Sequence, residues 1–95
     1  MSYDDFDQAL RTLGVPPRAS LAEVRQRHRA LVKRLHPDAG GSDSEAIRAL
    51  NEAYRLVQEY CRNYHYDFSR EEFLEQNPEE RLREQFAHDA IWRGR

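Results

Sequence analysis

The chain has 95 residues, of which 34% are charged and 39% hydrophobic, and its formal net charge at pH 7 is −2. This length fits one small domain with an appendage, and the composition is typical of a soluble, highly helical protein. No apolar run approaches the ~20 residues that a membrane-spanning helix needs, and no signal peptide is recognisable, so we expect a cytoplasmic protein without a membrane partner. Cys61 is the only cysteine, so no internal disulfide and no cysteine-based zinc site is expected. We also expect no cofactor and no other metal.

Positive charge is concentrated in one stretch of the sequence. Residues 20–35 carry a net charge of +4, whereas the residues before and after them sum to −1 and −5. A single basic segment in an otherwise acidic chain indicates an acidic partner surface. The rival hypothesis is a nucleic-acid-binding helix, but such domains are usually basic overall, so no nucleic acid partner is expected. In that hypothesis the phosphate contacts would come from Arg25, Arg27, Arg29 and Arg34.

The first predicted helix covers about residues 4–13. Asp4 or Asp5 is placed to cap its start, and Gly14 is expected to end it in the left-handed conformation. The prolines that follow cannot continue a helix. The apolar stripe of this helix consists of Phe6, Leu10 and Leu13.

The second predicted helix covers residues 21–35 and is the basic one. Ser20 and Glu23 form a capping box at its start, and Pro37 prevents it from running far past its last leucine. Its apolar stripe consists of Val24, Leu31 and Leu35, with His28 between them. A neighbouring face carries three basic side chains, each four residues from the next: Arg25, Arg29 and Lys33.

A loop over residues 36–42 leads to a third predicted helix at about 43–62. Ser42 with Glu45, or Asp43 alone, is expected to cap it. The apolar stripe of this helix consists of Ile47, Leu50, Tyr54, Val57 and Cys61. Asn51 lies beside that stripe, where it either faces solvent or ties the preceding loop to the helix by a side-chain hydrogen bond. The first two predicted helices are joined by a short linker and share an apolar seam, so they pack most simply as antiparallel neighbours.

The C-terminal segment, residues 63–95, is rich in aromatic side chains. Seven of the chain's ten aromatic residues fall between Tyr60 and Trp92, which argues against disorder. Capping signals at Ser69 and at Asn77-Pro78 predict short helices at about 70–76 and 78–88, followed by a loose Ile91-Trp92 segment. We expect the aromatic residues to pack back on the preceding helices, and the alternative is an exposed surface for a client protein or for targeting.

Four motifs occur in a specific order along residues 3–60: Leu13-Gly14-Val15, His28-Arg29-Ala30-Leu31, His36-Pro37-Asp38 and Leu50-Asn51-Glu52-Ala53-Tyr54. Each motif is weak alone, but the ordered set resembles the J-domain that defines the DnaJ chaperone family. The C-terminal segment is similar to the extension of a group of small bacterial J-proteins. The resemblance implies an all-α fold in which an antiparallel hairpin of helices II and III is braced by helix I. From the aromatic residues we expect the short C-terminal helices to be packed on this hairpin.

J-domains are not enzymes, so the resemblance implies a co-chaperone. Such domains bind a DnaK-type chaperone of the 70-kDa heat-shock class and stimulate its ATP hydrolysis. The docking residues implied here are Arg25, His28, Arg29 and Lys33. The stimulating motif is His36-Pro37-Asp38, and Asn51 is the implied loop support. We expect a monomer whose C-terminal segment is a possible client-binding region, and the alternative function is a J-like adaptor that binds without stimulating.

The sequence departs from the usual J-domain pattern at four positions. His28 stands where the family usually has tyrosine, which makes the contact smaller and sensitive to pH. Ala30 and Ala39 stand where basic residues are common, and Leu35 where many members have an aromatic residue. These departures bear on affinity and partner choice rather than on the basic mechanism.

Overall fold

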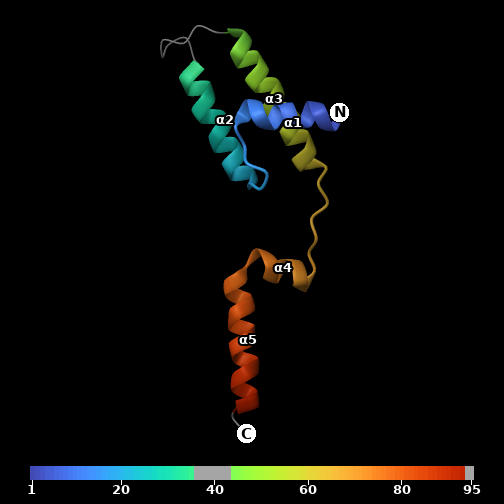
Figure 1. Cartoon of the computed structure of the whole chain (residues 1–95). Coiled ribbons are helices and arrows are strands. Elements are labelled where there is room, and N and C mark those ends of the chain that lie inside the picture. Colours follow the sequence, from blue (N-terminus) through green and yellow to red (C-terminus); the bar gives the residue numbers. More distant parts are fainter. Residues whose placement is uncertain (36–43, 94–95) are drawn as a thin grey trace. The chain divides into compact units, whose positions relative to one another are not determined.

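The computed structural model describes the backbone of residues 1–35 and 44–93, and the side chains of residues 1–35 and 44–89. All regular elements in these ranges are α-helices, which confirms the all-α prediction (Figure 1). The chain divides into two compact units, Met1–Tyr64 and His65–Arg95. The helices are α1 (Tyr3–Leu13), α2 (Leu21–Leu35), α3 (Ser44–Arg62), α4 (Arg70–Gln76) and α5 (Pro78–Arg93).

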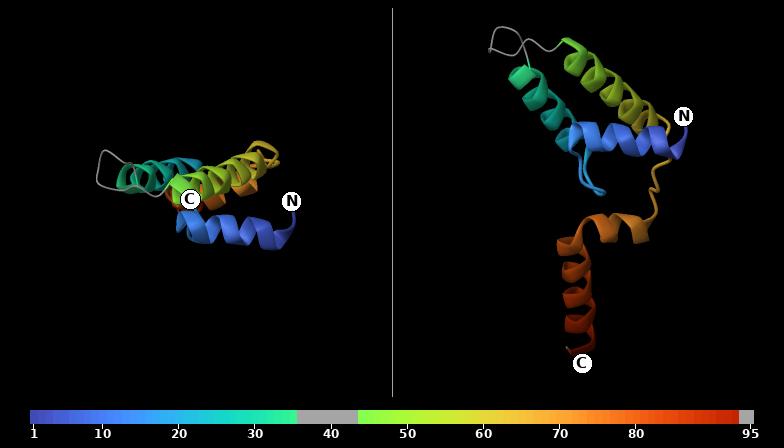
Figure 2. Two further views of the ribbon diagram at one scale, coloured as in Figure 1. Left: turned by 90° about the horizontal axis from the view of Figure 1, so that it is seen from above. Right: turned by 45° about the horizontal axis from the view of Figure 1, so that its top comes forward.

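In the first unit, α2 and α3 form an antiparallel hairpin, and α1 lies across one face of this pair (Figures 1 and 2). α1 packs mainly on α3 and also touches α2, so it braces the hairpin as the resemblance implies. The apolar stripes of the three helices meet in one core. Two alanines outside the predicted stripes, Ala9 and Ala53, belong to this core, where small side chains let helices approach closely. The buried residues are Ala9, Leu13, Val24, Leu50, Ala53 and Val57.

The start of α1 is set by Ser2 and not by the aspartates expected there. The Ser2 hydroxyl accepts a hydrogen bond from the Asp5 amide at 3.1 Å, and the Asp5 carboxylate accepts one from the Ser2 amide at 3.5 Å. Asp4 and Asp5 therefore lie in the first turn, where acidic side chains favour the positive end of the helix dipole. The prediction that one of them is the cap was wrong, because a serine two or three residues earlier completes a capping box.

The end of α1 follows the prediction. Gly14 has φ 67° and ψ 33°, the left-handed conformation that glycine adopts without steric cost, and its amide donates to the Arg11 carbonyl oxygen at 3.1 Å. α2 then begins at the predicted capping box. The Glu23 amide donates to the Ser20 hydroxyl at 3.2 Å, and the Ser20 amide donates to the Glu23 carboxylate at the same distance. The expected cap of α3, at Ser42 or Asp43, lies outside the described residues.

The second unit contains two helices joined at a single residue. The Ser69 hydroxyl accepts a hydrogen bond from the Glu72 amide at 3.2 Å, as the capping signal predicted, and the Ser69 amide donates to the Asp67 carboxylate at 2.9 Å. The Asn77 side chain donates to the Phe73 carbonyl oxygen at 2.9 Å, while its own carbonyl oxygen accepts from Glu80 in the first turn of α5. Asn77 therefore ends α4 with its side chain and starts α5 with its backbone.

α5 is longer than predicted. It extends to Arg93, whereas a helix over 78–88 and a loose Ile91-Trp92 segment were expected. The reason is that no glycine or proline follows Pro78 until Gly94, so nothing in the intervening sequence interrupts the helix.

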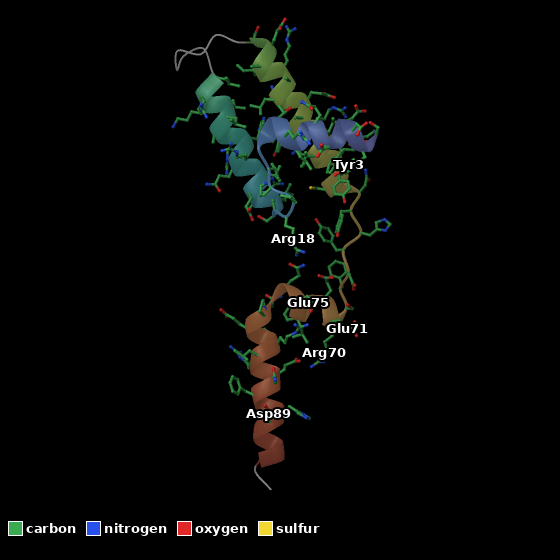
Figure 3. The ribbon with its side chains drawn as sticks, viewed as in Figure 1. Tyr3, Arg18, Arg70, Glu71, Glu75 and Asp89 are labelled. Atoms are coloured by element: carbon green, nitrogen blue, oxygen red, sulfur yellow. The ribbon has the colours of Figure 1, made fainter. Side chains whose placement is uncertain are left out.

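Ion pairs join α4 to α5. Arg70 pairs with Glu84 and Arg81 with Glu75, and Figure 3 labels Arg70 and Glu75 on α4. None of the residues from His65 to Asp89 is buried, and their large apolar side chains are more exposed than a folded core allows. Those more than half exposed are Tyr66, Phe68, Phe73, Leu82 and Phe86. The packing of these helices on the hairpin stays a prediction.

Candidate functional site

The basic ridge, which consists of Arg25, Arg29 and Lys33, lies along α2, and all three side chains are exposed. The structure shows no ion pair between the ridge and any side chain of residues 1–35 or 44–89. Nitrogen-bearing side chains project outward from α2 in Figure 3. Like charges four residues apart destabilise a helix by roughly 0.2–0.5 kcal/mol per pair, so helix stability does not explain this row. It is a charged surface available to a partner.

The outer face of α3 is arranged differently, because its charges neutralise one another. The Arg55 guanidinium donates to Glu52 at 2.7 Å and to Glu59 at 3.2 Å. The hydrogen bond from Arg55 lowers the pKa of the Glu52 carboxyl, and the same contact raises the pKa of Arg55. The unpaired positive charge of the hairpin is therefore concentrated on α2.

Arg27 lies on α2 but has a structural partner. Its Nε–H donates to the carbonyl oxygen of Leu13, the last residue of α1, at 3.0 Å. Its guanidinium also covers Gly14, where an added Cβ would lie 2.9 Å from Nη2. Arg27 therefore ties α1 to α2, and the nucleic-acid hypothesis loses one of the four arginines on which it depends.

His28 is half-buried and contacts α3. Its ring stacks on that of Tyr54 with a centroid distance of 4.0 Å and an interplanar angle of 7°. Its Nε2 atom lies 3.0 Å from the Oδ1 atom of Asn51. The structure thus places His28 between the basic ridge and α3, as the apolar stripe of α2 predicted, and joins it to two residues of α3.

Asn51 was expected either to face solvent or to support the loop after α2. Its side chain is exposed, and its Oδ1 atom contacts His28. Any contact with the loop lies outside the described residues. Its role as loop support stays a prediction.

The His36-Pro37-Asp38 motif lies outside the described residues. α2 ends at Leu35, the residue directly before it, and α3 begins at Ser44. In sequence the motif therefore begins at the residue that directly follows α2. Its role stays a prediction.

Other chemistry at the described residues is limited. Burial raises the pKa of the Cys61 thiol, which disfavours the thiolate that a cysteine nucleophile needs. No group of three or more metal-ligating side chains comes together within residues 1–35 and 44–89. None of the described helices is both long and apolar enough to cross a membrane.

Two contacts of the site were not predicted from the sequence. The bond from Arg27 to Leu13 and the stacking of His28 on Tyr54 each join residues on different helices, 14 and 26 positions apart. Helical spacing identified the face that each residue occupies, but it carries no signal for the partner across the interface.

The fold and the ridge define a small all-helical module: a hairpin braced by a crossing helix, with one unpaired basic face. The DnaJ domain matches residues 9–67, which is more than half of the chain. The chain therefore belongs to the DnaJ domain family.

Several curated relatives match part of the chain or nearly all of it. An uncharacterized 19.0 kDa protein of a Sinorhizobium species is 38% identical over 55 residues, covering 55% of this chain and 32% of its own length. The chaperone protein DnaJ of Caldicellulosiruptor saccharolyticus is 36% identical over 58 residues, which cover 58% of this chain and 15% of the relative. The chaperone protein DnaJ 2 of Nocardia farcinica is 36% identical over 64 residues, which cover 64% of this chain and 17% of the relative. The chain thus spans less than a third of the length of these relatives. No solved structure matches it significantly.

Proposed function

We propose that this protein is a cytoplasmic co-chaperone that binds a DnaK-type chaperone of the 70-kDa heat-shock class and stimulates its ATP hydrolysis. The observation that carries the proposal is the exposed, unpaired basic ridge on the braced hairpin of a DnaJ domain. The ridge leads along α2 into His36-Pro37-Asp38. In this proposal the ridge docks on an acidic surface of the chaperone, and the motif provides the stimulating contact.

The chemistry of the residues suits these roles. The planar guanidinium groups of Arg25 and Arg29 present forked donors that match carboxylates. Exposed charge pairs contribute only about 0.2–1 kcal/mol each, but a row of them accelerates association with an oppositely charged surface. Pro37 restricts the loop before binding, which reduces the entropy that docking costs. Asp38 can accept hydrogen bonds from an arginine of the partner.

The hydrolysis itself belongs to the partner in this proposal. The second candidate function is an adaptor that binds the chaperone without stimulating it. The complete His36-Pro37-Asp38 motif favours stimulation over the adaptor.

Single-turnover ATP hydrolysis by a DnaK-type chaperone, with and without the purified chain, tests the proposal. We expect the wild-type chain to accelerate hydrolysis, and His36→Gln and Asp38→Asn to remove the acceleration with unchanged helicity. A chain that binds the ATP-loaded chaperone without accelerating hydrolysis would establish the adaptor. Full stimulation by both variants would contradict the proposed role of the motif.

A further inference from the structure

The His28 ring occupies the seam between the basic ridge and α3. It is half-buried and stacks on the half-buried ring of Tyr54, with a distance of 4.0 Å between the ring centroids and an interplanar angle of 7°. In sequence it stands three residues after Arg25 and directly before Arg29, two members of the ridge. A partner that covers the ridge therefore comes close to an imidazole whose position is fixed by α3.

The contact with Asn51 favours one tautomer of the His28 ring. Oδ1 of Asn51 lies 3.0 Å from Nε2 and can only accept, so a hydrogen bond between these atoms requires the tautomer in which Nε2 donates. In the neutral ring the unprotonated nitrogen is then Nδ1. A proton gained at Nδ1 leaves the bond to Asn51 intact, and the resulting cation stacks favourably on the face of Tyr54. The seam accommodates both charge states of His28 without a change of packing.

The charged residues within one helical turn of His28 on α2, and of Asn51 on α3, are mostly positive. On α2 they are Arg25, Arg27 and Arg29. On α3, those within one turn of Asn51 are Arg48, Glu52 and Arg55, and Glu52 is already paired with Arg55. The free hairpin thus supplies no unpaired carboxylate to a charged imidazole from these positions. An acidic partner docked on the ridge would supply one.

We propose that His28 is a specificity-determining residue that links chaperone docking to proton uptake. The inference rests on the proposed function, because it requires an acidic partner surface on the ridge. Docking brings carboxylates towards the ring and favours its protonated form, so the complex holds more protons than the separated proteins. Affinity therefore increases as the pH falls through the range in which histidine changes charge, about pH 8 to about pH 6.

The size of the effect follows from the exposure of the contact. One added charge in a solvent-accessible pair corresponds to a roughly two- to five-fold change in affinity. A tyrosine at this position would stack in the same way but would stay neutral over the same range. The histidine thus makes affinity depend on pH where an uncharged aromatic residue does not.

Affinity of the full-length chain for an ATP-bound DnaK-type chaperone, measured at about pH 6 and about pH 8, tests the inference. His28→Phe keeps a ring on Tyr54 without a titrating group, and His28→Gln keeps a donor towards Asn51. All three proteins retain His36, so a pH dependence that arises from the motif or from the chaperone is common to them. We expect wild type to gain roughly two- to five-fold more affinity at the lower pH than either variant.

Calorimetry in buffers of different ionisation enthalpy provides the second measurement, and wild type should take up more protons on binding than the variants. Equal pH profiles and equal proton uptake in all three proteins overturn the inference while leaving the proposed function in place. If none of the three binds the chaperone at either pH, the proposed function fails and the inference fails with it.

Discussion

The Nε–H group of Arg27 donates to the carbonyl oxygen of Leu13 at 3.0 Å, so a side chain of α2 accounts for a backbone acceptor at the end of α1. Leu13 is fully buried at the centre of the core. This bond gives Arg27 a partner within the fold. The side chain of Arg25, two residues earlier on the same helix, has no hydrogen bond or ion pair to the described residues. Of these two arginines on one basic helix, Arg27 therefore has a structural partner, and Arg25 is the one that we propose for docking.

We predict that Arg27→Met lowers the free energy of unfolding by about 1–3 kcal/mol, because it removes a charged donor from a partly buried carbonyl oxygen. Chemical denaturation followed by circular dichroism measures the loss. Arg25→Met is the matched control and should change stability little while slowing association with the chaperone. Equal stability of the two variants would contradict the structural role of Arg27.

We predict that Gly14→Ala destabilises the hairpin by about 1–2 kcal/mol, because its φ of 67° lies in the left-handed region that other residues occupy at a cost. The new Cβ would also lie 2.9 Å from Nη2 of Arg27. Combining the substitution with Arg27→Met removes this clash but not the backbone cost. The double variant should therefore lose less stability than the sum of the single variants, and strict additivity would show that the two residues are not coupled.

We predict that chaperone association depends strongly on salt, because the ridge carries three charges without described partners. Arg29→Glu should slow association, measured by stopped-flow fluorescence. Arg83→Glu is the matched charge reversal on α5, where Nη1 of Arg83 lies 3.5 Å from Oε1 of Glu80. This control should slow association less than Arg29→Glu does. An association rate that is insensitive to salt would rule out electrostatic docking.

We predict slow alkylation of Cys61 in the folded protein. Burial raises the pKa of this thiol above its value in the unfolded chain, so less thiolate is present at a given alkaline pH. The resulting contribution to stability is present at neutral pH and is lost as the pH rises through the pKa of the folded thiol. Iodoacetamide rates against pH, with and without denaturant, measure the difference. A folded rate equal to the unfolded one would refute it.

The parts of the fold that depend on a few neighbouring residues were predictable from the sequence. The Ser20–Glu23 capping box and the left-handed Gly14 follow from local hydrogen bonding and backbone sterics. Partners across helices were not predictable, because several side chains share each face at the same spacing. The cap of α1 shows a different limit: Ser2, Asp4 and Asp5 are all good caps, and only the folded backbone distinguishes them.

The last prediction concerns the C-terminal unit. Phe68 is 92% exposed and Phe86 65% exposed, and the described residues from His65 to Asp89 include none that is buried. Short helices gain most of their stability from packing, and α4 and α5 are joined by surface ion pairs that contribute little. These helices therefore need another surface, and the smallest assumption is that the hairpin provides it.

We predict that truncation after Asn63 lowers the thermal midpoint clearly, because each aromatic side chain that packs on the hairpin adds about 1.5–3 kcal/mol if fully buried. ATPase stimulation should persist at temperatures where the fragment stays folded, since the ridge and its motif remain. Truncation after Tyr64 is the control, because it removes the C-terminal helices but keeps the contact between the rings of Tyr60 and Tyr64, whose centroids are 5.9 Å apart.

Trp92 fluorescence provides a second measurement. In the full chain it should be blue-shifted and poorly quenched by iodide. A freely quenched Trp92 together with an unchanged thermal midpoint would contradict the brace and favour a client-binding surface.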